Sequence, residues 1–138
     1  MKSLLHALKL DFLPASSDLA LLVLRVWLGA SMIGLHGWKK LANFSAIAEK
    51  FPAIIINGQV SLGLAVLTEV VASVFLIAGL FGRLAALGSA ITMAVAFFIT
   101  HGGKLVGEGN GELAFIYLAG YVALAIAGPG RFSMDRAL

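Results

Sequence analysis

Two ionisable residues lie inside long apolar runs of the sequence. Arg25 interrupts the run from residue 19 to 35, and Glu69 lies in the middle of the run from residue 60 to 81. Because an unpaired charge is costly in lipid, both side chains should face the interior of a helix bundle. Their distances from the start of each run predict a direct or water-bridged Arg25–Glu69 ion pair. Such a pair would act in proton transfer or substrate binding, or would only fix the helix register.

A second set of polar residues falls at the ends of the apolar runs. With four membrane crossings, all of these residues lie at the same membrane face. The set consists of His36, Lys39, Lys40, His101, Lys104 and Glu112. His36 and Lys40 share a helix face because they are four residues apart. We expect His36 to take part in proton transfer or substrate binding with Arg25 and Glu69. Lys40, His101 and Glu112 are candidates for substrate binding, although lysines at this depth also extend to lipid phosphates.

These residue types favour a quinone over other cofactors, while the cofactor itself stays open. An apolar space between helices would take the tail, and His, Lys or Glu would hydrogen-bond the ring oxygens. Haem or a metal is less expected, because no helix carries a paired His motif. The chain has no cysteine, which removes thiolate ligands and nucleophiles. It also lacks a strand followed by the glycine fingerprint of flavin or nicotinamide sites.

The elements that must position these residues are transmembrane helices. Of the 138 residues 60% are hydrophobic and 12% are charged, whereas soluble domains carry roughly a quarter charged residues. We therefore predict an all-α integral membrane four-helix bundle with short interfacial helices. The predicted domain covers residues 16–130, followed by a C-terminal tail of residues 131–138. Its spans are residues 19–36, 60–81, 84–100 and 112–128.

Three segments outside the spans have patterns of their own. Residues 1–15 place leucines and Phe12 at helical spacing among charges, which predicts an interfacial helix. A signal peptide is the alternative, but Asp11 interrupts the apolar core that one would need. Residues 37–59 predict a second interfacial helix that ends before Pro52. The connection from residue 101 to 112 holds five glycines, so it bends closely around something or is mobile.

The charge distribution favours a membrane partner over nucleic acid. Ten Lys and Arg residues against seven acids give a net charge of +3, and they lie at the ends of the apolar runs, where lipid headgroups would be. We expect a multi-pass protein of a bacterial inner membrane. Four crossings place both termini on one side, and a slight excess of basic residues there favours the cytoplasm.

The order of motifs resembles the DoxX family. The resemblance is carried by Arg25 with Gly29, by the His-Gly-Trp-Lys-Lys segment of residues 36–40, by Glu69, and by the turn of residues 79–83. The segment Gly-Pro-Gly-Arg-Phe-Ser-Met-Asp of residues 128–135 extends the resemblance to nearly the whole chain. The positions that recur in this family match Arg25, His36, Lys40, Glu69 and Glu112.

The resemblance implies a relative of the small subunit of thiosulfate:quinone oxidoreductase, a family with other members tied to thiol stress and redox partners. Our leading hypothesis is a redox-associated subunit that handles quinone or a small redox substrate. A soluble or membrane partner would supply electrons, since the chain has no evident electron carrier. A non-catalytic membrane adaptor or anchor is the alternative, and a small transporter or metal-handling protein comes third. Whether the chain is an enzyme stays open, and a homodimer would provide a pocket between protomers.

Overall fold

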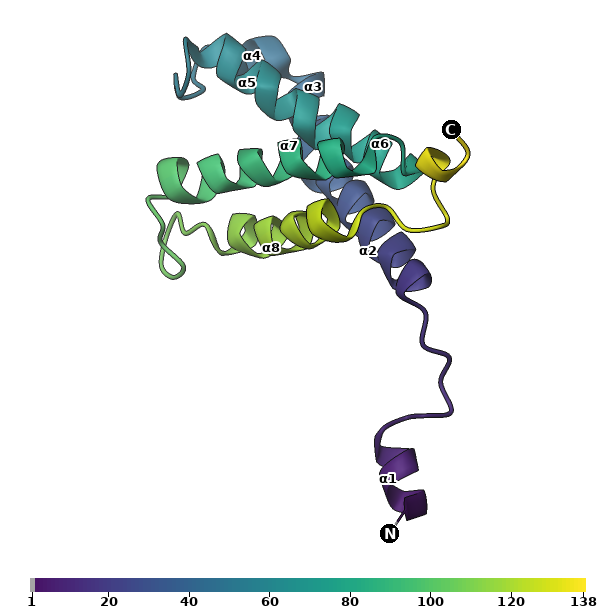
Figure 1. Ribbon diagram of the computed structural model, residues 1–138. Coiled ribbons are helices and arrows are strands. Elements are labelled where there is room, and N and C mark those ends of the chain that lie inside the picture. The colour runs from purple at the N-terminus through teal and green to yellow at the C-terminus, as the bar shows by residue number, and fades with distance from the viewer. Residues whose placement is uncertain (1) are drawn as a thin grey trace.

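The computed structural model describes residues 2–138, and helices are its regular elements, with no strand in that part of the chain. Four long helices form the body of the molecule (Figure 1). The first is α2 (Ser17–Met32), η1 (Ile33–Gly37) and α3 (Trp38–Ala42); the second is α5 (Gly58–Val66), η2 (Leu67–Ala72) and α6 (Ser73–Ala78); the third is α7 (Gly82–Val95) and η3 (Ala96–Thr100); the fourth is α8 (Glu112–Ala127).

The helices lie where the apolar runs predicted them, and the fold is an all-α bundle of the membrane type. Three of them, Ser17–Ala42, Gly58–Ala78 and Gly82–Thr100, are long and apolar enough to cross a membrane. The fourth, α8, is apolar but has 16 residues. It spans about 24 Å at about 1.5 Å per residue, which is shorter than a hydrocarbon core of about 30 Å. That α8 also crosses the membrane stays a prediction.

The core lies between α7, α8, α2 and α6. Figure 1 shows α7 and α8 side by side, with α2 crossing behind them. Small residues on α7 allow the close approach to α8, since Ala86 and Ala90 are both buried. Tyr121 of α8 and Leu76 of α6 are buried in the same cluster. Charged side chains that reach this core must find partners inside it.

Two glycines set how the first long helix packs against the second. A Cβ at Gly29 would lie 2.8 Å from the carbonyl oxygen of Ser73, and one at Gly37 would lie 2.9 Å from that of Glu69. The two backbones therefore touch at both levels, in antiparallel register. Gly37 was expected to follow the end of the first span, but the helix continues to Ala42, because Gly37 serves close helix contact rather than termination.

The interfacial segments differ in how they join the bundle. Helix α1 (Lys2–Leu8) lies well apart from the bundle in Figure 1. In the first connection, α4 (Phe44–Ala48) ends before Pro52, as expected for this segment. The chain after α4 is tied to α5, because the Ser61 hydroxyl accepts hydrogen bonds from the backbone N–H groups of Ile54 and Ile55. The membrane position of both helices stays a prediction.

Candidate functional site

Three π-helical segments carry or adjoin the candidate site residues. His36 lies in η1, Glu69 lies in η2, and His101 directly follows η3. A π-helical turn shifts the hydrogen bonds from the fourth to the fifth residue and widens the helix, and such segments are frequent at functional sites. All three helices thus change geometry where they approach the same region of the bundle.

Glu69 pairs with Lys40, which reaches it from α3. The Lys40 Nζ lies 2.5 Å from the Glu69 Oε1, and the side chains are 27% and 5% exposed. The other carboxylate oxygen, Oε2, is buried and has no hydrogen-bond partner among residues 2–138. The carboxylate is therefore half satisfied, with one oxygen bound to a cation and the other without a hydrogen-bond partner in the described residues.

The predicted pairing of Arg25 with Glu69 is wrong. The Arg25 guanidinium, 2% exposed, donates to the carbonyl oxygens of Pro129, at 3.2 Å, and Phe132. The reason is the register set by Gly29 and Gly37, which places Arg25 against Gly79 instead of Glu69. Lys40 takes the place of Arg25 at Glu69 because the first helix runs on beyond its apolar part.

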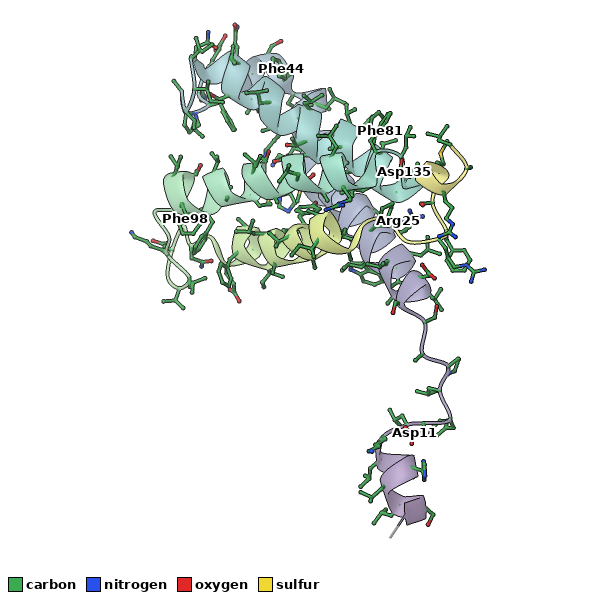
Figure 2. All side chains as sticks on the ribbon, in the orientation of Figure 1. Asp11, Arg25, Phe44, Phe81, Phe98 and Asp135 are labelled. Carbon is green, nitrogen blue, oxygen red and sulfur yellow. The ribbon has the colours of Figure 1, made fainter. Side chains whose placement is uncertain are left out.

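Arg25 belongs to a cluster in which the C-terminal tail closes the opposite end of the bundle. The Asp135 carboxylate accepts hydrogen bonds from the N–H groups of Phe81, at 2.6 Å, and Gly82, at 2.8 Å, and so caps α7. Gly79 has a φ of +68°, and a Cβ there would overlap the Arg25 side chain. Figure 2 shows Arg25 and Asp135 at this end of the bundle. Their hydrogen bonds indicate a structural role for both residues.

An apolar groove of about 410 Å³ runs along the bundle beside the Lys40–Glu69 pair. One wall comes from the second helix and the other from α7 and η3, and both rims carry exposed apolar side chains such as Leu64 and Ile91. Two hydroxyl groups, of Thr68 and Thr92, lie 2.8 Å apart in its lining. The lining of the groove is thus mostly apolar, and it includes the Lys40–Glu69 pair.

A second, more polar cavity of about 310 Å³ lies on the other side of the pair. Lys40, Glu69 and His101 line it as well, together with His36 and Tyr117. The His36 ring meets the Tyr117 ring edge-on at 6.0 Å between centroids. The Nε2 of His36 is buried without a hydrogen-bond partner in the described residues. Four of the predicted site residues are therefore together, on the walls of this cavity.

His101 also anchors a neighbouring segment, and Glu112 lies apart from both cavities. His101 donates from Nδ1 to the carbonyl oxygen of Gly109, at 2.7 Å, which anchors the glycine-rich connection. In a neutral ring this leaves Nε2 as an acceptor. Glu112 is exposed at the start of α8, where its backbone N–H is capped by Asn110, and it lines neither cavity.

The sequence did not single out Tyr117, Asn110 or the two threonines, although all four line the cavities. Burying a hydroxyl or amide group costs far less than burying a charge, so these residues carry a weaker signal in the sequence. Helical spacing held one clue, since Tyr117 and Tyr121 are four residues apart and their rings stack at 5.9 Å. In residues 2–138, no group of three or more His, Asp or Glu side chains is placed to hold a metal ion.

The fold and these two cavities define a small helical membrane protein with a buried Lys–Glu pair between an apolar groove and a polar cavity. The DoxX family matches residues 20–102, which is more than half of the chain. The protein belongs to the DoxX family. The matched part includes Arg25, His36, Lys40, Glu69 and His101, while α8 and the tail lie beyond it.

Two similar proteins come from Haemophilus influenzae, and both are described as uncharacterized. One is 32% identical over 119 residues, covering 77% of this chain and 81% of its own length. The other is 30% identical over 129 residues, covering 86% of this chain and 83% of its own length. No solved structure matches the chain. These relatives support the family and carry no statement about a reaction.

Proposed function

We propose that the protein binds a quinone, with the ring at the Lys40–Glu69 pair and the tail in the apolar groove, as the membrane subunit of a redox system. The observation that carries this proposal is a part-buried ion pair in the lining of a mostly apolar groove. A quinone ring needs a donor and a proton-exchanging group for its oxygens, and its tail needs apolar walls. Lys40, Glu69 and His101 meet the first need.

The electrons for this chemistry come from a partner protein, soluble or membrane-bound. The protein lies in a bacterial inner membrane with α8 as the fourth crossing and both termini in the cytoplasm. The Lys40–Glu69 end of the bundle then faces the opposite side, where the partner docks. A non-catalytic adaptor would use the same polar groups only for helix packing.

The test fills the groove without touching the ion pair. Gly88 lines the groove, and a Cβ there would meet only the methyl group of Thr68, at 3.7 Å. Gly88→Leu therefore places a side chain where the tail would lie. We expect the affinity of the protein in lipid nanodiscs for a short-chain ubiquinone to fall on the order of tenfold or more.

Gly63→Leu is the matched control, because a Cβ at Gly63 meets no atom within 4 Å and this residue does not line the groove. It should bind quinone as the unmodified protein does. Equal binding by both variants would place the quinone elsewhere. If the unmodified protein binds no quinone and Glu69→Gln still retains a copurified partner protein, the adaptor is the better description.

A further inference from the structure

The apolar groove and the polar cavity adjoin at the Lys40–Glu69 pair, because both residues line both spaces, as do Ala96 and His101. Among the residues that line the polar cavity, two buried atoms make no hydrogen bond within the described chain, the Glu69 Oε2 and the His36 Nε2. A quinone in the groove accounts for the groove side of the pair only. The polar cavity also has His36 and Tyr117 in its lining, and these residues do not line the groove.

The groups facing Glu69 come from every element around the polar cavity. Lys40 of α3 is the cation bound to Oε1, while His36 of η1 and His101 after η3 are imidazoles. From α8, the Tyr117 hydroxyl donates to Ser31 Oγ at 2.8 Å, and the Tyr121 ring stacks beneath it. The Glu69 carboxylate thus has one cation, two imidazoles and a phenol among the groups around the polar cavity.

We propose that the polar cavity is a water-filled path that carries protons from the membrane face to Glu69. This proposal rests on the proposed function in one respect only, namely that the molecule in the groove is a quinone. Partly exposed Asn110 and His101 lie at the mouth. A hydronium ion gives its proton to Oε2 and leaves as water, and the protonated Glu69 later passes one proton to the molecule in the groove. Lys40 stays charged throughout, and no electron moves in this step.

The experiment compares side chains that narrow one space at a time. Ala114 lines the polar cavity and not the groove, so Ala114→Leu narrows the path, whereas Gly88→Leu fills the groove. Infrared difference spectra after a pH step, recorded without quinone, follow the Glu69 carboxyl band, which Glu69→Gln identifies by its loss. We expect Ala114→Leu to slow the band change on the order of tenfold or more, and Gly88→Leu to leave it within about twofold.

An unchanged rate in Ala114→Leu, or a Glu69 band that does not respond to pH, overturns the proposal. A second measurement covers the case in which Ala114→Leu fails to fold. Because the chain has no cysteine, Ala114→Cys introduces a single thiol into the cavity. Charged methanethiosulfonate added to proteoliposomes should modify this thiol, from one side of the membrane, and should leave Gly88→Cys unmodified. Absence of reaction at Ala114→Cys also overturns the proposal.

Neither measurement contains quinone, so their outcome is independent of the quinone-binding test. If the groove binds no quinone but the Glu69 band follows pH through the polar cavity, the proposed function fails and the proton path stands. If quinone binds but Ala114→Leu does not alter the rate of the Glu69 band change, the proposed function stands and the proton path fails.

Discussion

The two ends of the bundle each bury a charged side chain, but they treat it differently. At one end, Arg25 is bound by the backbone carbonyl groups of Pro129 and Phe132, and Asp135 caps α7 beside it. At the other end, Glu69 has one bound and one free oxygen, next to two cavities. Each charged group keeps one buried atom without a hydrogen-bond partner in the described residues, Nε of Arg25 and Oε2 of Glu69. The difference is that Arg25 is held by backbone groups of the tail, which supports a structural role, whereas Glu69 lines two cavities, where a ligand could meet it.

The largest effect on stability is expected at Arg25. Arg25→Met removes two hydrogen bonds from a charged donor, at about 1.5–3 kcal/mol each, so we expect a loss of about 3–6 kcal/mol in the free energy of unfolding. Thermal unfolding in detergent measures this. Arg83→Met is the control at the same end, because Arg83 is exposed and has one hydrogen bond, to Ala125. A stable Arg25→Met protein that had lost only quinone binding would move the functional site to this end.

The Lys40–Glu69 end is tested by a double-mutant cycle. Lys40→Met alone leaves the buried Glu69 charge unpaired, so it should destabilise the protein more than the double variant Lys40→Met/Glu69→Gln does. We expect a coupling free energy of about 0.5–3 kcal/mol from urea or thermal unfolding. Strictly additive effects would show that the two side chains do not interact. Quinone binding should be lost in Lys40→Met, in Glu69→Gln and in the double variant.

The smallest effect is expected at Asp135. Asp135→Ala removes the side-chain cap from the first turn of α7, which costs about 0.5–2 kcal/mol of stability. Thermal unfolding checks the loss, and quinone affinity should stay within about twofold, since the cap lies at the end remote from the groove. Met134→Ala is the neighbouring control, because Met134 is exposed. A strong loss of affinity in Asp135→Ala would mean that the two ends are coupled.

The sequence predicted the helices well, because long apolar runs have few other structures in lipid. It also predicted that His36 and Lys40 share a face, which requires only helical spacing. It did not predict the end of the first helix, since Gly37 and the lysines after it read equally well as a helix stop. Only the contact of Gly37 with the second helix shows why the chain stays helical there.

The sequence could not predict the partners of the two buried charges, for a related reason. Counting residues from the start of each run assumes that the runs begin at matching depths. Close backbone contacts at Gly29 and Gly37 set the actual offset between the first two long helices. These contacts depend on how residues far apart in the sequence pack together. The partners of Arg25 are backbone carbonyl groups of the tail. Every residue has a carbonyl group, so the sequence does not mark which ones bind Arg25. The segment of residues 128–135, on which the family resemblance partly rested, was the available hint.

The three π-helical segments also bear on how sequences of this kind diverge. A π-helical turn holds one residue more than the α-helical turn it replaces, so deleting a residue there restores α-helix without rotating the flanking turns. The same deletion within α7 would rotate every later side chain by about 100° and turn its buried face outward. Alignments of related chains should therefore place single-residue gaps beside His36 or Glu69, inside the helices rather than in the loops.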